Sequence, residues 1–254
     1  MMDALIEIAF LVLGGALALV LIYYFALALA SLLPDSRARR QIAASRGEMR
    51  FVVLVPAHDE EQLVGRTLES LSAIDYPRDR MSVVVIADNC SDGTEAIVRA
   101  AGRECWVRSD PERRGKGHAL EWAFARLRKE DSFDAVVVID ADTLVDPQLL
   151  RVLEARFAAG AEAVQAYHDV HRPERTPMSS LTYLGVALSR NLKYPGRARL
   201  GSSANLLGNG MAFSRRVVAE VGWNAVSVAE DSEFQLELYM RGFRVAFARE
   251  ARVA

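Results

Sequence analysis

The sequence has few cysteines and no strong excess of charge of either sign. Cys90 and Cys105 are the only two cysteines among 254 residues, and they do not form a Cys-x-x-Cys pair. A disulfide framework and a zinc site are therefore not indicated, and a reducing, cytoplasmic setting fits such a chain. The formal net charge of -2 provides no overall basic field that would attract nucleic acid. We therefore expect no nucleic-acid partner.

The N-terminal part of the chain lacks charge over one long stretch. Residues 8–33 contain no charged side chain, and about 20 apolar residues suffice to cross the ~30 Å hydrocarbon core of a bilayer. We therefore predict a transmembrane helix, with residues 1–33 as a membrane anchor. A cleaved signal peptide is the alternative, but such peptides begin with basic residues, whereas Asp3 and Glu7 precede this run.

Basic residues follow the apolar stretch directly. Arg37, Arg39, Arg40 and Arg46 lie in a predicted juxtamembrane linker, residues 34–50. An excess of Lys and Arg beside a transmembrane helix marks its cytoplasmic end. The prediction is a single-pass protein of the cytoplasmic (inner) membrane, with residues 51–254 as one catalytic domain in the cytoplasm.

Beyond the linker, strand-like runs alternate with helix-like runs. This alternation predicts an α/β fold with a mostly parallel central sheet flanked by helices. Short runs rich in Val and Ile indicate buried strands. Asp59 and Gln62 have the spacing of a capping box before a helix. Strands are expected at residues 51–57, 82–88, 135–140 and 244–248, and further helices at 94–101, 118–128, 147–158 and 230–240.

Acidic residues follow three of the predicted strands. These strands run into the segments PAHDEE (from Pro56), DNCSDG (from Asp88) and DAD (from Asp140). In open α/β sheets, ligands bind outside the carboxyl ends of the strands, where these segments would meet. Each segment alone is equally typical of a turn or a helix cap. Together they predict a site at this edge of the sheet.

Asp140 and Asp142 are the more specific pair. Residues two apart in an extended segment project to one side, so they can share a cation or divide between a metal and a ribose. Mg²⁺ or Mn²⁺ held by such carboxylates and by substrate phosphates would neutralise a departing diphosphate. A divalent cation is therefore the expected cofactor, and a solvated strand end is the alternative.

A basic, glycine-flanked turn precedes the helix predicted at residues 118–128. Arg113, Arg114 and Lys116 lie there, where backbone N–H groups and the helix dipole favour an anion such as a diphosphate. A basic surface turn is the alternative. The segment lacks the Walker A spacing, and no Gly-x-Gly-x-x-Gly follows the first strand. P-loop chemistry and hydride transfer are therefore disfavoured.

Two features lie near the C-terminal end. Glu230 and Asp231 open the last predicted helix, where a carboxylate could take a proton from an attacking hydroxyl or could simply stabilise the helix N-terminus. Upstream, residues 207–211 combine flexible backbone at Gly210 with the amide of Asn209. Such a segment suits close approach of a sugar or an acceptor, and a strand-entry turn is the alternative.

The order of these motifs resembles the inverting family 2 glycosyltransferases of the GT-A fold. PAHDEE, DNCSDGT, RRGKGHAL, VVVIDADTLVDP, GNGMAF and AEDSEFQLEL occur in the family's order from about residue 51 to the end. The chain is most similar to bacterial exopolysaccharide-synthesis members, relatives of cellulose and hyaluronan synthases. The resemblance implies transfer from a nucleotide-diphosphate sugar, in particular a UDP-sugar, to a glycan or lipid-linked acceptor. Further polysaccharide-synthesis subunits would be partners.

The resemblance also implies roles for individual residues. Asp88 corresponds to the residue that binds uracil or ribose, and Lys116 lies near the diphosphate. Asp140 is similar to the ribose or metal contact, Asp142 to the principal metal ligand and Asp231 to the general base. Pro56 and Glu60 join the donor site, and Asn209, Gly210 and Glu230 the acceptor side.

Two alternatives and one departure remain. Processive synthases carry a Gln-x-x-Arg-Trp motif and membrane helices after the base, neither of which occurs before Ala254. We therefore expect a fragment, or a short member whose acceptor site is completed by other means. A catalytically silent nucleotide-sugar-binding subunit of a polysaccharide assembly complex is the alternative function, against which Asp231 argues. A nucleotidyltransferase ranks last, because PAHDEE lacks the glycine-rich start GxGTRLxP.

Overall fold

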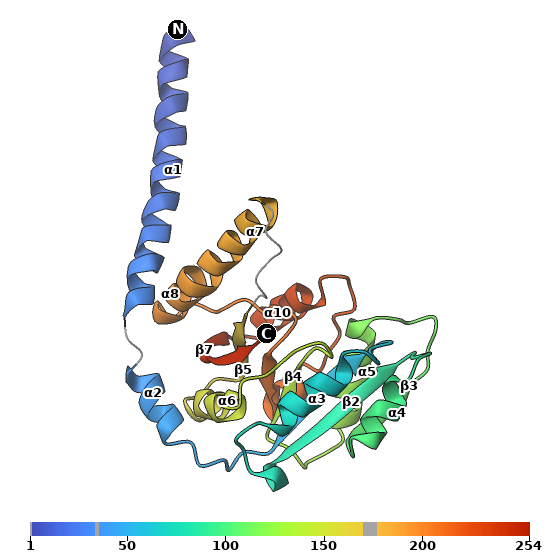
Figure 1. Cartoon of the computed structure of the whole chain (residues 1–254). Coiled ribbons are helices and arrows are strands. Elements are labelled where there is room, and N and C mark those ends of the chain that lie inside the picture. Colours follow the sequence, from blue (N-terminus) through green and yellow to red (C-terminus); the bar gives the residue numbers. More distant parts are fainter. Residues whose placement is uncertain (1, 34–35, 170–176) are drawn as a thin grey trace. The chain divides into compact units, whose positions relative to one another are not determined.

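The computed structural model describes residues 2–33, 36–169 and 177–254. The chain divides into two compact units. The larger unit contains residues 35–173 and 203–254, and the smaller unit contains residues 1–34 and 174–202. A segment from the second half of the sequence therefore belongs with the N-terminal helix. Figure 1 shows the elements of both units.

The larger unit is built on a seven-stranded sheet of order β3-β2-β1-β4-β6-β5-β7. The pairs among β1 to β4 are parallel, β6 runs antiparallel to both of its neighbours, and β5 pairs with β7 in parallel. The predicted mostly parallel α/β fold is therefore confirmed. The strands are β1 (Phe51–Ala57), β2 (Met81–Asp88), β3 (Glu104–Arg108), β4 (Ala135–Val138), β5 (Ala163–His168), β6 (Met211–Ser214) and β7 (Val245–Val253).

Helices cover both faces of this sheet. On one face, alternate residues of β1 pack in a single cluster with apolar residues of α3, α4 and α6. On the other face, Phe124 of α5 meets Phe213 of β6, Trp223 and Phe234 of α10, and the last two rings stack 4.3 Å apart. The helices are α2 (Ser36–Ala43), α3 (Val64–Ser72), η1 (Arg78–Arg80), α4 (Thr94–Ala100), α5 (Lys116–Leu127), α6 (Leu149–Ala158), α9 (Arg215–Glu220) and α10 (Glu230–Met240).

The structure corrects two details of the sequence prediction. Asp59 does not cap a helix, because α3 begins at Val64 after Leu63, which makes no side-chain cap. The Asp59 carboxylate instead accepts the Ser91 N–H at 2.6 Å and so links the loops after β1 and β2. In addition, β4 ends at Val138, so residues 140–142 form a turn rather than an extended segment.

A buried carboxylate fixes the linker to the larger unit. Glu154 of α6 accepts the Ser45 hydroxyl and the N–H groups of Gly47, Glu48 and Met49. Burial alone would raise the pKa of Glu154, but these hydrogen bonds outweigh it and lower the pKa. The Tyr76 hydroxyl also donates to the Met49 carbonyl. Residues 45–49 are therefore held against α6 and the start of β1.

The smaller unit contains α1 (Met2–Leu32), α7 (Pro177–Leu188), the π-helix η2 (Ser189–Lys193) and α8 (Tyr194–Arg199). The most apolar 18-residue window of α1 has a mean hydropathy of 2.7, so α1 is long and apolar enough to cross a membrane. Gly196 of α8 lies against the Leu27 backbone, where any side chain would clash with the Leu27 carbonyl. The last turns of α1 therefore pack on α8.

Candidate active site

A cavity of about 310 Å³ lies at the carboxyl ends of β1, β2 and β4. This is the edge at which ligands bind in open α/β sheets. The structure brings every residue predicted for donor and metal binding to this one cavity. Its lining includes Pro56, Glu60, Asp88, Lys116, Asp140 and Asp142, together with His58 and Arg114.

Strained backbone marks the ends of β1 and β2. Within the described residues, Asp59 (φ 54°) and Asn89 (φ 51°) are the only non-glycine residues with positive φ. Such conformations persist only where surrounding contacts hold them, and they are common at functional sites. Here the His58 ring nitrogen Nδ1 lies 2.7 Å from the Asp88 carbonyl, and the Asp110 N–H donates to the Asn89 side chain at 2.7 Å. The two strand ends therefore form one cross-linked wall of the cavity.

Asp88 is held by an arginine that the sequence did not suggest. Arg108 ends β3 opposite Asp88 in the sheet register, and both side chains are buried. Its guanidinium donates to Oδ1 of Asp88 at 2.5 Å and to Asp110 at 2.9 Å. The Asn89 amide also donates to Oδ1. These bonds leave Oδ2 of Asp88 as the oxygen able to accept from a ligand. Because β3 itself was not predicted, the role of Arg108 had no local signal.

Lys116 joins three parts of the site. It is the first residue of α5, after Gly115 in a positive-φ conformation. Its ammonium lies 2.5 Å from Oδ1 of Asp140, 2.6 Å from the Gly208 carbonyl and 3.9 Å from a carboxylate oxygen of Glu230. One cation therefore connects the turn after β4, the loop before β6 and the start of α10.

The side chain of Asn209 holds the turn that carries Asp140 and Asp142. The buried Asn209 side chain accepts the Asp140 N–H at 3.2 Å and donates to the Thr143 hydroxyl at 2.7 Å. Asp142 is exposed, and the hydroxyl of Thr143 donates a long hydrogen bond of 3.5 Å to its carboxylate. Thus Asp140 is restrained, whereas the carboxylate of Asp142 is available to a ligand.

The residues predicted for the acceptor side divide between two places. Asn209 is buried beneath the Asp140 turn, and Gly210 (φ 68°) packs under β7, where an added Cβ would lie 2.9 Å from Val253. Glu230 lies beside Lys116 at the start of α10. Asp231 is the next residue, and neither Glu230 nor Asp231 lines the cavity. A Cβ placed on Gly208 would lie 3.8 Å from Oδ2 of Asp231. The Lys116 ammonium and the Asp231 carboxylate therefore both lie close to Gly208.

The carboxylates around the cavity repel one another. Burial raises the pKa of Glu60, and the negative charges of Asp142, Asp92 and Asp140 raise it further. A bound cation would relieve this repulsion, and carboxylate oxygens are the ligands that Mg²⁺ and Mn²⁺ prefer. The residues present at the cavity therefore fit a divalent cation.

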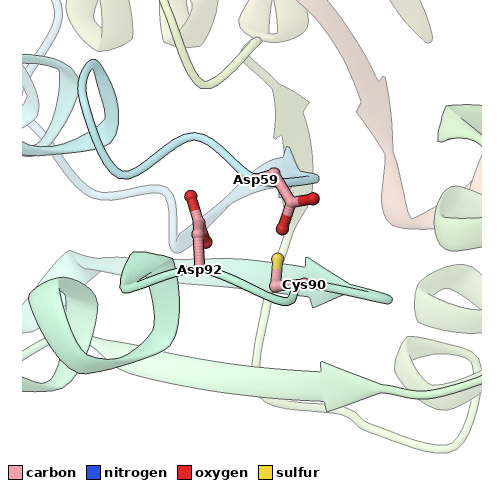
Figure 2. Close-up of side chains that lie close together, drawn as sticks. All are labelled: Asp59, Cys90 and Asp92. Atoms are coloured by element: carbon pink, nitrogen blue, oxygen red, sulfur yellow. The ribbon is translucent and has the colours of Figure 1, made fainter.

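A second group could hold a metal by distance alone. Potential ligand atoms of Asp59, Cys90 and Asp92 lie within 4.8 Å of one another, in the loops after β1 and β2 (Figure 2). Both carboxylates are already engaged, Asp59 by Ser91 and Asp92 by the N–H groups of Glu61 and Thr94. Burial raises the pKa of the Cys90 thiol, which disfavours the thiolate that binds metals. The hydrogen bonds of this group connect the loop after β1 to the loop after β2.

Known proteins resemble this chain in sequence and in fold. Probable glycosyltransferase YdaM of Bacillus subtilis is 28% identical over 204 residues, which cover 77% of this chain and 48% of the relative. Poly-beta-1,6-N-acetyl-D-glucosamine synthase of Staphylococcus aureus is 24% identical, with 76% of this chain and 47% of the relative covered. This chain thus spans about half the length of these curated relatives.

A solved structure matches most of the chain. Mannosyltransferase PcManGT from Pyrobaculum calidifontis, in complex with GDP-Man and Mn²⁺, superposes with a TM-score of 0.64 at 25% identity, covering 94% of this chain and 66% of that one. The family described as "Glycosyltransferase like family 2" matches residues 49–254. The match includes the larger unit from just before β1 to the last residue, with every side chain of the cavity. The chain belongs to the family 2 glycosyltransferases.

Proposed function

We propose that this protein is a membrane-anchored, inverting glycosyltransferase that uses a nucleoside-diphosphate sugar. The observation that carries the proposal is the single cavity in which Asp88, Lys116, Asp140 and Asp142 meet. It offers a buried acceptor for a nucleoside, a cation for phosphates and two carboxylates for a metal. The family resemblance favours uracil as the base, and the GDP-Man complex of PcManGT makes guanine the alternative to be tested.

Each end of a donor has a partner along the cavity. Oδ2 of Asp88, fixed by Arg108, would accept from the base or the ribose beside Pro56. Lys116 and Arg114 also line the cavity and would face the diphosphate. A phosphate there would compete with Asp140 for the Lys116 ammonium, so donor binding would loosen the ion pair between these two residues.

Asp142 and Asp140 would hold the divalent cation. Asp142 has the exposed, weakly bonded carboxylate, whereas the carboxylates of Asp59 and Asp92 are occupied by loop hydrogen bonds. When bound, Mg²⁺ or Mn²⁺ neutralises charge on the departing diphosphate. PcManGT, whose structure contains Mn²⁺, gives independent support for this cofactor class.

Asp231 would act as the general base. Its carboxylate would take the proton of an acceptor hydroxyl as the oxygen attacks the anomeric carbon. The bond from this carbon to the diphosphate breaks on the opposite side, so the product linkage is inverted. Glu230, beside Lys116, would face the acceptor.

The biological setting proposed is synthesis of exopolysaccharide or another cell-surface glycan at the inner membrane. The apolar helix α1 supports the membrane anchor, and the likeness to an N-acetylglucosamine polymer synthase supports the product class. The acceptor would be a glycan or a lipid-linked sugar, and other synthesis subunits would complete the assembly.

Calorimetry on the detergent-solubilised protein tests donor and metal together. Mn²⁺ should tighten binding of UDP by about tenfold or more, which equals ~1.4 kcal/mol, and GDP should bind more weakly. Asp142→Asn should remove most of the metal effect. The matched control is Asp131→Asn, an exposed carboxylate that pairs with Arg215 and does not line the cavity. A metal effect that is absent from the parent, or equal in both variants, would contradict the assignment of Asp142.

Release of UDP from UDP-sugars separates the enzyme from the silent subunit. Membranes that contain the protein and its native acceptors should release UDP from at least one donor of a UDP-sugar panel. Binding of UDP without release from any sugar, by a preparation of the full-length gene product, would favour the silent nucleotide-sugar-binding subunit.

A further inference from the structure

The helix α7 exposes an apolar face that the smaller unit leaves uncovered. Met178, Leu181, Leu184 and Leu188 are 72%, 63%, 53% and 49% exposed. Their spacing of three, three and four residues places them on one side of a helix. Soluble proteins rarely expose contiguous apolar patches of this kind, and such patches mark binding surfaces.

The charges that follow α7 all have the same sign. Residues 177–188 carry no charge, and residues 189–202 contain Arg190, Lys193, Arg197 and Arg199 but no Asp or Glu. These four side chains are partly exposed on η2 and α8. An apolar helix followed by a basic segment is complementary to a lipid surface that has acyl chains below and phosphates above.

The packing of α8 places this segment at one end of the apolar helix. Gly196 lies against the backbone of Leu27, which is five residues before α1 ends at Leu32. Leu27 and Ala30 are buried there, whereas the preceding turns of α1 are exposed. If α1 spans the bilayer, its covered end lies at the level of the headgroups, and α8 lies there with it.

We propose that α7, η2 and α8 form a second membrane contact, in which α7 lies in the interface of an anionic bilayer. The proposal rests on the proposed anchoring by α1. Met178, Leu181, Leu184 and Leu188 enter the acyl boundary, while the basic residues of η2 and α8 contact lipid phosphates. With 12 residues, α7 is about 18 Å long, so α7 alone is too short to cross a core of ~30 Å.

Spin labels on the full-length protein test this placement. The protein is reconstituted in vesicles of phosphatidylcholine and phosphatidylglycerol, with Cys90 and Cys105 replaced by alanine. Single cysteines are then introduced as Leu181→Cys and Leu184→Cys on α7. Leu13→Cys reports on α1, and Met240→Cys, an exposed apolar position on α10, is the control in the larger unit. The readout is collision of each label with oxygen, which concentrates in lipid, and with a water-soluble nickel chelate.

The expected result is a ratio of oxygen to nickel collisions at 181 and 184 several-fold above that at 240. Vesicles of phosphatidylcholine alone should lower the ratio at 181 and 184 but not at 13. Labels at 181 and 184 that behave like the label at 240 overturn the proposal. Spin–spin coupling between copies at 184 also overturns it, because a second copy of the chain then covers the face.

The label at Leu13 keeps the two proposals apart. A lipid-exposed label at 13 with water-exposed labels at 181 and 184 leaves the anchor in place and removes the second contact. A water-exposed label at 13 removes the anchor. In that case, lipid-exposed labels at 181 and 184 would show that the surface contact exists without a transmembrane helix.

Discussion

At the scale of single residues, Lys116 links three parts of the site. Its ammonium bonds to Asp140 and Gly208 and lies near Glu230, which come from segments far apart in the sequence. Without the Lys116 ammonium, the negative charges of Asp140 and Glu230 would be less neutralised. The same group would meet the donor phosphates, so Lys116 serves both the architecture of the site and its ligand.

Asp231→Asn should abolish transfer and preserve binding of UDP. The substitution keeps the size and hydrogen bonding of the side chain but removes its basicity. A positioned general base contributes about 100-fold to 10,000-fold in rate, so UDP release should fall by that order. Glu237→Gln, on the same helix but paired with Arg241, is the control and should retain activity. Transfer that survives in the Asn variant would exclude Asp231 as the base.

Sequence reasoning found the residues whose chemistry is visible in their type and spacing. The lining of one cavity contains the predicted residues Glu60, Asp88, Lys116, Asp140 and Asp142. Arg108 was missed, and Gly208 lay within the predicted segment 207–211 without a role of its own, because both roles depend on neighbours far away in the sequence. Arg108 matters through its register opposite Asp88 on an unpredicted strand, and Gly208 through a backbone carbonyl, which every residue possesses.

At the scale of elements, the antiparallel strand β6 brings a further loop to the site. Met211, its first residue, pairs with Val138, the last residue of β4. Because the two strands run in opposite directions, the loop before β6 emerges at the same edge as the turn after β4. Residues 208–210 therefore lie beside Asp140. The sequence indicated β6 only through the alternative of a strand-entry turn at residues 207–211, because a strand of four residues is too short to show a clear alternation.

The attachment of the linker to α6 should depend on the charge of Glu154. Hydrogen bonds to charged groups contribute about 1.5–3 kcal/mol, so Glu154→Gln should destabilise residues 45–49 by that amount and speed their amide hydrogen exchange. Glu95→Gln, which removes an exposed ion pair with Arg99, should leave their exchange unchanged. Equal exchange of residues 45–49 in the parent and the Glu154 variant would contradict this role.

The same attachment should be sensitive to acid. The pKa of Glu154 is lowered from its ordinary 4.5 in the folded state. A lowered folded pKa means that the stabilisation is complete above the unfolded pKa and is lost as the pH falls through the folded value. Protection of residues 45–49 should therefore be constant above about pH 5 and decline below 4.5, and this decline should be absent in the Gln variant.

At the scale of the whole molecule, the chain combines a unit whose first helix is apolar enough to cross a membrane with a unit of the family 2 glycosyltransferases. The sequence indicated the first from its uncharged run and the second from its motifs. It did not indicate that residues 174–202 belong with the N-terminal helix. Such a grouping depends on packing between Gly196 and Leu27. No local sequence pattern at either residue predicts this contact.

Reporter fusions at Ala254 should place the catalytic unit in the cytoplasm. Arginines beside an apolar helix are retained on the cytoplasmic side, so a fluorescent-protein fusion should be bright and an alkaline phosphatase fusion inactive. Replacing Arg37, Arg39, Arg40 and Arg46 by glutamine should weaken this preference and raise phosphatase activity. An active phosphatase on the parent chain would reverse the proposed orientation and separate the site from cytoplasmic nucleotide sugars.

The strand order in the sheet also determines the order in which the strands can pair during synthesis. Strands β1 to β4 can pair with one another as soon as β4 is made, whereas β5 pairs only with β6 and β7, which both follow it. The end of β5 and the start of β6 are separated by 42 residues, whose synthesis takes about 2–8 s at ~5–20 residues per second. During that interval β4 presents an open edge and β5 has no partner. The nascent chain therefore passes through a half-sheet that already carries Asp88 and Asp140, and its open strand edge makes this species prone to aggregation and a target for chaperones.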